Sequence, residues 1–256
     1  MKKTELRKRR AFPSAIAPVG AVFKEAIAST RSAYYLGTKF KCPICRWHFR
    51  RLLTFAGRRH NAICPKCYSL ERHRLLWAYI EGATDLLEGS KRLLHFAPEN
   101  CLEKRFKEVR HLEYMTADLH RPNVMWRMNI ERIPFGDNSF DAVIANHVLE
   151  HVENDLQAMN EILRVLKPSG WAILQVPLDV HRSETFEDQR IVDEQDRTRY
   201  FGQHDHVRLY GVDYPDRLRS AGFVVDVVHQ QDFLGQRLID RYALYTGEPI
   251  FKGVKS

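Results

Sequence analysis

Four of the five cysteines in this 256-residue chain fall into two Cys-Pro-x-Cys pairs. The first pair is Cys42 and Cys45, the second is Cys64 and Cys67, and 18 residues separate the two pairs. Two short turns of this kind, facing each other, supply four sulfur ligands to a tetrahedral zinc ion. Because sulfur would fill every ligand position, the ion would be structural and would not activate water. We therefore predict a four-cysteine zinc ribbon over residues 39–69.

Disulfides or a redox motif are the alternatives for these cysteines. Disulfides belong to oxidising compartments, and the N-terminal segment lacks the continuous apolar run of a secretory signal. A redox CxxC motif would not need two copies in one small region. We favour zinc and expect a cytoplasmic protein with a basic tail and an N-terminal helix over residues 1–38. We expect the fifth cysteine, Cys101, to be a packed residue and not a nucleophile.

A second group of residues that could do chemistry lies near the C-terminal third. His204 and His206 flank an aspartate, and they follow an acidic segment, 186–199, that could form a lid helix over a substrate. An imidazole there could act as a general base, clamp a substrate or bind a metal. The segment could instead be a hydrogen-bonded turn that anchors the lid. His147 and His151 are rival candidates for a base, although His151 fits a packed helix start better.

The basic character of the chain lies in its N-terminal third. Residues 1–90 hold 18 Lys and Arg against 6 Asp and Glu, in a chain whose net charge is +8. Such a surplus could serve nucleic acid, an acidic substrate or an anionic surface, or it could offset the thiolates of a metal site. Aromatic and basic residues alternate over residues 46–63, which suits stacking on bases. The same pattern suits a small ribbon packed on the next domain, and we favour packing.

The elements that must position these side chains follow from hydrophobic patterning. An apolar run, Ala142–Ala145, stops at the polar pair Asn146 and His147. A helical pattern follows, residues 167–170 break it, and a second apolar run begins at residue 171. Strand, helix, turn and strand in this order predict a βαβ unit with a parallel sheet. Ligands bind beyond the carboxyl ends of such strands, so Asn146 and His147 would stand at a ligand site.

The remaining length fits one α/β domain plus a small appendage. No apolar run approaches the roughly 20 residues needed to cross a bilayer, so we predict no membrane span. Ser69 is the expected N-cap of a helix that follows the ribbon. We expect further strands over residues 92–99, 112–118, 223–230 and 241–247, a third strand ending near 128–130, and helices over 70–83 and 215–222.

Residues 133–170 resemble the central part of class I S-adenosylmethionine-dependent methyltransferases of the type 11 subgroup. The resemblance is carried by Ile133-Pro134-Phe135, Asp137–Asp141, Val148–Val152 and Glu161–Gly170. Ser169 departs from it, because the family usually has glycine there. Residues 64–76 and 201–211 are similar to segments of bacterial methyltransferases that carry an N-terminal ribbon. The resemblance implies an α/β fold, namely a Rossmann-like class I methyltransferase with a mostly parallel sheet over residues 70–256, preceded by the ribbon.

The resemblance also implies a cofactor, S-adenosylmethionine, and residues that bind it. Where the family has a glycine-rich turn, this chain has Ala97, Pro98 and Glu99. Glu99 would accept a hydrogen bond from the methionine amino group, or it would be an ordinary helix-start carboxylate. Asp118 would bind both ribose hydroxyls, or it would be an exposed acid at a strand end. The predicted cofactor-binding residues are Ala97, Pro98, Glu99, Asp118, Leu119, Asn129, Ile130, Asn146 and His147.

Within that set, Asn129 replaces the family's usual aspartate, and its amide oxygen could still accept the adenine amino group. Ile130 would pack on the adenine ring. Methyl transfer mainly requires alignment of the reacting atoms in a dry pocket, with a base where the acceptor must lose a proton. His204 and His206 are the catalytic candidates.

We expect a methyltransferase acting on a small-molecule or glycan acceptor, because no dedicated RNA-binding module is evident. An RNA methyltransferase that uses the basic ribbon is one alternative. A zinc-containing binding protein that has lost activity is another, since the usual glycines are missing. The sequence does not indicate the oligomeric state.

Overall fold

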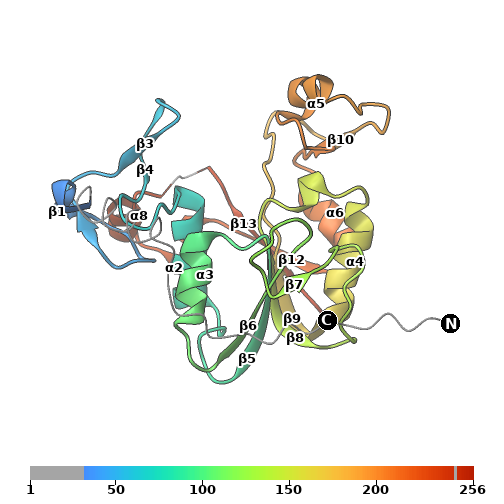
Figure 1. Ribbon diagram of the computed structural model, residues 1–256, viewed down its shortest axis with the longest axis horizontal. Helices are drawn as coiled ribbons and strands as arrows, with labels where there is room; N and C mark the ends of the chain where they lie inside the picture. Colours follow the sequence, from blue (N-terminus) through green and yellow to red (C-terminus); the bar gives the residue numbers. More distant parts are fainter. Residues whose placement is uncertain (1–31, 245–246) are drawn as a thin grey trace.

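Four short strands occupy the region predicted as a ribbon. The computed structural model describes residues 32–244 and 247–256 (Figure 1). Most of the expected tail and helix over residues 1–38 lies outside the described residues. Two antiparallel hairpins follow, formed by β1 (Leu36–Lys41) with β2 (His48–Phe49) and by β3 (Leu53–Phe55) with β4 (Arg59–Ile63).

A seven-stranded sheet forms the centre of the molecule, in the order β12-β13-β9-β8-β5-β6-β7. The pairs from β9 to β7 are parallel, and β13 runs antiparallel to both of its neighbours. This is the Rossmann-like methyltransferase fold, so the predicted fold class is confirmed. The strands are β5 (Lys91–Phe96), β6 (Leu112–Asp118), β7 (Trp126–Arg127), β8 (Phe140–Ala145), β9 (Leu166–Ile173), β12 (Val224–Val228) and β13 (Ile250–Val254).

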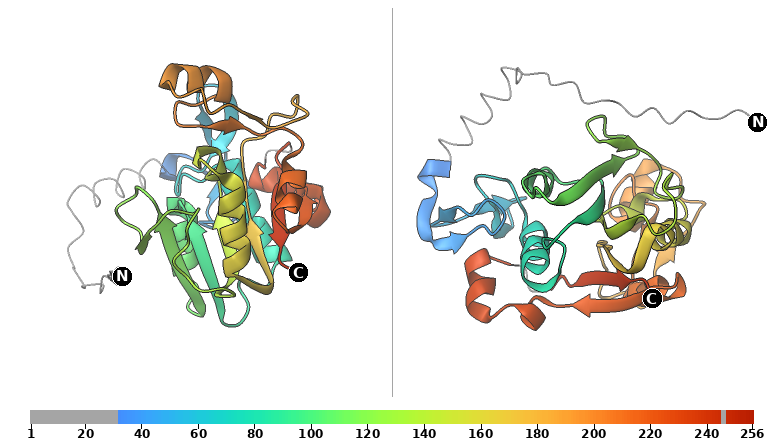
Figure 2. Two further views of the ribbon diagram at one scale, coloured as in Figure 1. Left: turned by 90° about the vertical axis from the view of Figure 1, so that its right-hand side faces the viewer. Right: turned by 90° about the horizontal axis from the view of Figure 1, so that it is seen from below.

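Helices cover both faces of the sheet, because successive strand residues point to opposite sides. Leu93 packs in one buried cluster with α2 (Glu71–Ala83), α3 (Asn100–Lys107) and α8 (Gln236–Tyr242), on the left in Figure 1. Leu94 packs in the other cluster with α4 (Asp155–Val165) and α6 (Tyr214–Ser220). The ribbon lies beside α8 at one end of the molecule, although the two are far apart in sequence (Figure 2).

Several short elements lie in the connections between the strands of the central sheet. They are the 3-10 helix η1 (Leu149–His151), β10 (Phe186–Glu187), α5 (Glu194–Phe201), β11 (Arg208–Leu209) and α7 (Gln230–Phe233). The expected lid segment thus forms a short strand and a helix that stand above α4 and α6 in Figure 1. In the part of the chain that the structure describes, no helix is long and apolar enough to cross a bilayer.

Residues 167–170 do not form the expected turn. Strand β9 already begins at Leu166, and a bulge shifts its pairing, since Phe140 pairs with Leu166 but Ala142 pairs with Trp171. Ser169 sits in the bulge with φ 62°. Glycine adopts this left-handed conformation at least cost, which explains why the family favours glycine here.

The expected last strand over residues 241–247 is wrong. Residues 236–242 form helix α8, and the last strand is β13, whose Ile250 and Phe251 are buried. Arg74 binds the carbonyl oxygens at the end of α8, which fixes this helix against α2. Ser69 is not an N-cap either, because the helix begins after Leu70.

Candidate functional site

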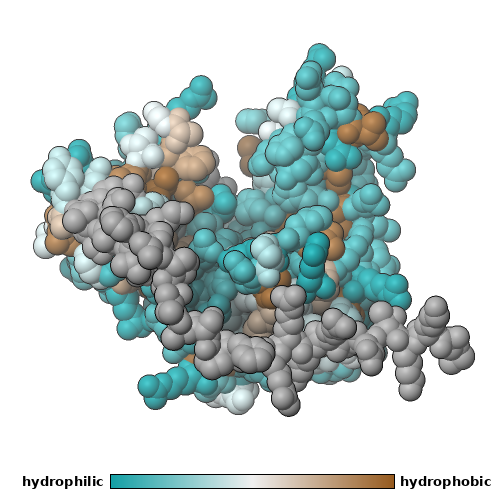
Figure 3. Space-filling view, viewed as in Figure 1, coloured by the Kyte–Doolittle hydropathy of each residue, from teal (hydrophilic) through white to brown (hydrophobic). Residues whose placement is uncertain are grey.

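A cavity lies where the parallel strands β5, β6 and β8 end. Its volume is about 710 Å³, enough for a nucleoside cofactor and part of an acceptor. The strand order reverses between β5 and β8, which is where open parallel sheets bind ligands. Figure 3 shows the molecule hollowed between the ribbon side and the side that carries α5. Of the predicted cofactor residues, the walls include Ala97, Asp118, Leu119, Asn129, Ile130 and His147.

Asp118 is the carboxylate that ends β6 in the cavity wall. Its Oδ1 accepts hydrogen bonds from the backbone N–H groups of His120 and Arg121, both at 2.7 Å. Among the described residues, its other oxygen, Oδ2, has no hydrogen-bond partner. One carboxylate oxygen therefore fixes the turn and orients the side chain, and the second can accept hydrogen bonds from a ligand.

The turn after β5 adopts a glycine-like conformation without a glycine. Ala97 has φ 45°, and its N–H donates to the carbonyl of Ala117 on β6 at 2.9 Å. The guanidinium of Arg121 donates to the carbonyl oxygen of Pro98, so Pro98 is held away from the cavity. The small Ala97 side chain leaves the backbone accessible to a ligand, as the usual glycines would.

Glu99 does not line the cavity, and protein groups already bind its carboxylate. His95 Nε2 and Asn146 Nδ2 each lie 3.1 Å from a carboxylate oxygen, and His73 Nε2 lies at 3.8 Å. Burial alone would raise the pKa of Glu99, but the His95 hydrogen bond and the two imidazoles outweigh it and lower this pKa to about 2. The ionised carboxylate thus fixes Asn146, which is itself 6% exposed and outside the lining.

Asn129 and Ile130 form the wall that follows β7. The Asn129 amide oxygen accepts from the N–H of Glu131 at 2.9 Å, and its Nδ2 donates to the Glu131 carboxylate at 2.9 Å. An amide oxygen has two lone pairs, so one stays available to a ligand donor. Ile130 and Met128 are buried beside it and give the wall an apolar surface.

His147 follows β8 in a left-handed conformation with φ 52°. Its Nδ1 lies 3.2 Å from the Glu150 carboxylate, and its Nε2 lies 3.9 Å from the carboxylate of Glu248. Its N–H donates to the carbonyl of Gln175 on the segment after β9. The imidazole is therefore held between two acids at the cavity wall.

The two catalytic candidates are in different environments. His204 is exposed, does not line the cavity, and lies 4.0 Å from the Asp205 carboxylate. His206 is 3% exposed, and burial lowers its pKa. Its ring packs edge-on against His151, with ring centroids 4.7 Å apart. His151, which the sequence favoured as a packed residue, lines the cavity instead.

Sequence reasoning missed the residues that hold this end of the cavity. Glu150 is 1% exposed and stands between His147 and His206 in the fold. Arg208 donates to the carbonyl oxygens of Leu149 and Val152, both at 2.6 Å. No local spacing in the sequence connects residues 147–153 with residues 201–208, so only the fold brings these groups together.

The four ribbon cysteines come together in one cluster. The Sγ atoms of Cys42 and Cys67 are 3.6 Å apart, and those of Cys45 and Cys64 are also 3.6 Å apart. Four sulfurs around a zinc ion at about 2.3 Å lie about 3.8 Å from one another, whereas a disulfide needs about 2.05 Å. The spacing fits a tetrahedral ion and excludes disulfides. The Ser69 hydroxyl lies 3.4 Å from Cys42 Sγ.

Two matching backbone turns produce this cluster. Arg46 and Tyr68 directly follow the second cysteine of each pair, with φ 63° and 58°. Their N–H groups donate back to the carbonyl oxygens of Cys42 at 2.8 Å and of Cys64 at 3.1 Å. Hydrogen bonds from the other cysteines lower the pKa of Cys42 and raise that of Cys45. Such neighbouring thiols become thiolates together only with a cation between them.

The aromatic and basic residues between the cysteine pairs divide into two kinds. Phe49 is fully buried and packs in the core next to the sheet. Trp47 and Phe55 stay exposed, and each is covered by a cation, Lys66 at 3.4 Å and Arg59 at 4.8 Å from the ring centroid. The packing interpretation therefore holds for Phe49, whereas two rings remain on the surface.

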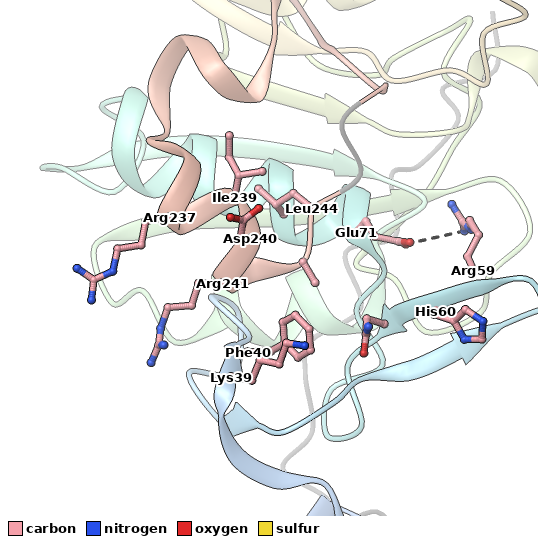
Figure 4. A pocket seen from close by; sticks show the side chains of 12 residues that line it. Lys39, Phe40, Arg59, His60, Glu71, Arg237, Ile239, Asp240, Arg241 and Leu244 are labelled. Atoms are coloured by element: carbon pink, nitrogen blue, oxygen red, sulfur yellow. Dashed lines mark ion pairs between the residues drawn. The ribbon is translucent and has the colours of Figure 1, made fainter.

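A second cavity, of about 730 Å³, lies between the ribbon and α8 (Figure 4). Lys39 and Arg59 come from the ribbon, and Arg237 and Arg241 come from α8. Arg59 forms an ion pair with Glu71 at 3.8 Å, so part of the positive charge is balanced. Asp240 also lines this cavity, which is separate from the strand-end cavity.

Comparisons with known proteins agree with the fold. The type 11 family model, described as a methyltransferase domain, matches residues 94–174. A demethylmenaquinone methyltransferase of Listeria welshimeri is 37% identical over 83 residues, which cover 32% of this chain and 32% of that protein. An uncharacterized protein of Methanocaldococcus jannaschii is 54% identical over 48 residues, which cover 19% of this chain and 21% of that protein.

These matches span about a third or less of the curated relatives. Among solved structures, an S-adenosylmethionine-dependent methyltransferase from Mesorhizobium loti is 13% identical, with a TM-score of 0.48, and the alignment covers 71% of this chain and 98% of that one. The prediction of a methyltransferase domain is confirmed by the family match and by the strand order. Residues 94–174, at the centre of a Rossmann-like sheet, thus match a methyltransferase domain model of the type 11 family.

Proposed function

We propose that this chain is an S-adenosylmethionine-dependent methyltransferase that acts on a small-molecule acceptor. The observation that carries the proposal is Asp118, whose Oδ1 is fixed by two backbone N–H groups while Oδ2 remains available in the wall of the strand-end cavity. A carboxylate in this position suits the paired hydroxyls of a ribose. The Ala97 turn and the apolar wall at Ile130 supply the close approach and the flat contact that an adenosine needs.

When bound, the cofactor supplies an electrophilic methyl group on a positively charged sulfur. The chain's own residues would bind and orient the cofactor and would exclude water from the cavity. Asp118 would hold the ribose, Asn129 the adenine amino group, and Ile130 the adenine face. Glu99 would act indirectly, because its carboxylate fixes Asn146 instead of lining the cavity. Such positioning, with little other chemistry, suffices for an in-line displacement at carbon.

Calorimetry with S-adenosylhomocysteine on the Asp118→Asn variant tests this assignment. Asparagine keeps Oδ1 and hence the turn at residues 118–121, but it removes the charge and one acceptor. We expect the Kd to rise at least about tenfold, equivalent to about 1.4 kcal/mol. Glu113→Gln is the matched control, since Glu113 lies on the same strand and its carboxylate is exposed beside Arg92. This variant should bind as the wild type does.

Equal binding by both variants would remove Asp118 from the site. Absence of binding to the wild-type protein would favour the alternative of an inactive zinc-containing binding protein. Cofactor binding without methyl transfer to any acceptor would also favour an inactive binding protein.

A small-molecule acceptor is favoured by the relatives. The Listeria protein is named for demethylmenaquinone. A glycan remains within the same proposal, because the cavity that takes the cofactor also borders His147, His151 and Asp205, which could hydrogen-bond acceptor hydroxyls. Product analysis by mass spectrometry with radiolabelled cofactor would identify the acceptor from a set of quinols and sugars.

An RNA acceptor is the second candidate, favoured by the basic cavity in Figure 4 and by the exposed rings of Trp47 and Phe55. Phosphate contacts release counterions, so RNA affinity would fall steeply between about 50 and 200 mM salt. Removing two cations with Arg237→Gln and Arg241→Gln would lower both the affinity and the salt slope. A methyl-transfer rate that does not change with salt or with these substitutions would exclude RNA as the acceptor.

The ribbon over residues 39–69 would be a structural zinc module, with residues 70–256 as the catalytic domain. Cys42, Cys45, Cys64 and Cys67 would be its ligands. Elemental analysis of the purified protein should find one zinc per chain, which a Cys64→Ser variant should lose. A zinc content that this variant retains would contradict the ligand set. The cytoplasmic location stays a prediction.

A further inference from the structure

Three side chains that can bind a metal ion meet beside the strand-end cavity, apart from the ribbon cysteines. They are Glu150 and His151 of η1 and His206 from the segment before β11. One ligand atom from each lies within 4.8 Å of those from the other two. Neither the family match nor the named relatives assign a metal to these residues.

The hydrogen bonds of both imidazoles leave the same nitrogen free to bind an ion. His206 Nδ1 lies 3.1 Å from the carbonyl oxygen of Phe201, and His151 Nδ1 lies 3.2 Å from the carbonyl oxygen of Asp205. A carbonyl oxygen only accepts, so each Nδ1 must carry the proton and each Nε2 keeps its lone pair. Metal-binding histidines are held in this way, with the second ring nitrogen donating to a carbonyl or carboxylate.

Asp205 strengthens the arrangement at His151. Its carboxylate Oδ2 also lies 3.2 Å from His151 Nδ1. A carboxylate behind a histidine makes the imidazole a better ligand, because it stabilises the positive charge that the ring shares with the ion.

Glu150 supplies a second, independent observation that points to a cation. Its side chain is 1% exposed. Oε1 lies 3.2 Å from His147 Nδ1, but the buried Oε2 has no hydrogen-bond partner in residues 32–244 and 247–256. A buried carboxylate oxygen without a partner is costly, and natural structures satisfy such groups with donors, water or ions. A cation between Glu150 and the two imidazoles would satisfy it.

The scaffold holds the three ligands in place without the ion. The N–H of Val207 donates to the carbonyl of Glu150 at 2.9 Å, which joins the two segments directly. Arg208 donates to the carbonyl oxygens of Leu149 and Val152 on either side of η1. A metal site needs such support, because a site whose ligands are mobile binds the ion more weakly.

We propose that Glu150, His151 and His206 bind a divalent transition-metal ion at the edge of the strand-end cavity. Two imidazoles and one carboxylate suit zinc, iron(II), cobalt or nickel, and they do not suit magnesium or calcium. Three protein ligands leave open positions, and His151 and Asp205 line the cavity, so the open side can accept an oxygen atom of an acceptor. Metal binding stands by itself, whereas the role toward an acceptor rests on the proposed methyl transfer.

Titration with Co²⁺ of protein that elemental analysis shows to hold one zinc per chain, and hence zinc in the ribbon only, tests the site by calorimetry. We expect one further ion to bind per chain, without the strong absorption of cobalt thiolates, which shows that the ribbon keeps its zinc. Kd should rise at least about tenfold in His151→Gln and in Glu150→Gln. His204→Gln is the matched control, because His204 lies in the same segment but is exposed and outside the ligand set. It should bind Co²⁺ as the wild type does.

The proposal is overturned if the wild type binds no further ion, or if His151→Gln and Glu150→Gln bind it with unchanged affinity. His151 is partly exposed, so its variant stays informative even where Glu150→Gln fails to fold, as circular dichroism would reveal. S-adenosylhomocysteine binding by the same samples separates the two proposals. A protein that binds the nucleoside but no Co²⁺ loses only the metal site, and the reverse result loses only the methyltransferase assignment.

Discussion

Arg74 and Arg208 are buried guanidinium groups on opposite sides of the sheet, and each joins backbone segments that are distant in sequence. Arg74, on α2, is fully buried. It donates to the carbonyl oxygen of Ala62 in the ribbon at 2.8 Å and to those of Tyr242 and Ala243 at the end of α8 at 2.7 and 2.8 Å. One side chain thus connects the ribbon, α2 and α8.

Arg208 joins distant backbone segments in the same way at the mouth of the strand-end cavity. It is 3% exposed and donates to carbonyl oxygens at residues 149, 152 and 153. It also forms ion pairs with Glu187 at 2.9 Å and with Asp155 at 3.7 Å. Both carboxylates bind a second cation, Arg217. The segment before β11 is therefore fixed to η1 by a network with more than one arginine.

We call the contacts of Arg74 the ribbon joint and the contacts of Arg208 the cavity joint. The two joints differ in how the charge of the arginine is balanced. In the part of the chain that the structure describes, Arg74 forms no ion pair with a carboxylate. Burial lowers the pKa of Arg74, and the largest opposing influence is Cys42 of the ribbon cluster. Four thiolates around a zinc ion carry a formal charge of about −2. With the proposed zinc bound, the cysteine cluster would balance the charge of the ribbon joint, whereas carboxylates balance the cavity joint.

The largest expected effect follows from Arg74→Met. The carbonyl oxygens of Ala62, Tyr242 and Ala243 lose their Arg74 donor at once. We expect a loss of about 3–5 kcal/mol in the free energy of unfolding, measured by urea denaturation. Arg74→Lys keeps the charge without the planar set of donors and should recover only part of the loss. Wild-type stability in Arg74→Met would show that another contact holds the ribbon to α8.

A smaller loss is expected from Arg208→Met. Asp155 and Glu187 would keep Arg217, so no buried carboxylate becomes unpaired. We expect about 2 kcal/mol, with zinc content unchanged and Co²⁺ binding at Glu150, His151 and His206 weakened. A greater loss than for Arg74→Met, in the same denaturation experiment, would reverse the comparison between the joints.

The sequence predicted those parts of the fold whose signal is local. The β8, α4 and β9 unit was predictable because apolar runs and a helical pattern follow one another within about 35 residues. The end of the chain was not. Residues 236–242 form a short helix whose position depends on Arg74, and β13 is short and finds its place only between β12 and β9. Tertiary contacts determine these positions, and a local pattern of residues contains no information about them.

The candidate site shows the same division. The cysteine cluster was visible because each Cys-Pro-x-Cys pair is a local motif, and Asp118 was visible because it ends a predicted strand in a stretch that resembles a known family. The grouping of Glu150, His151 and His206 was not visible, since two loops must meet to create it. The sequence also could not tell His204 from His206. A single hydrogen bond, from His206 to the carbonyl of Phe201, turns one of them inward.

The smallest expected effect is a pH response of the ribbon joint, at His73 on α2. Burial lowers the pKa of His73 to about 4, with Arg72 and Arg74 adding to the shift and Glu99 opposing it. The unfolded chain binds this proton near pH 6.5, so it holds more protons than the folded state between pH 6.5 and 4, and stability must fall as the pH falls. Between pH 7 and 5.5 we expect a loss of about 1 kcal/mol.

His73→Gln should reduce this slope, since glutamine does not titrate, and the remainder is the contribution of His206. Zinc content measured at both pH values shows whether the ribbon retains its metal. The lowered pKa of Glu99 affects stability only at lower pH. The ionised carboxylate stabilises the fold at pH values above the ordinary pKa of glutamate, and this contribution is lost as the pH falls toward 2. The cavity joint adjoins His206, whose pKa is also lowered by burial. Arg208→Met leaves both His73 and His206 in place and should keep the wild-type slope. An identical slope in wild type and His73→Gln would assign the acid sensitivity to His206 or to the ribbon cysteines instead.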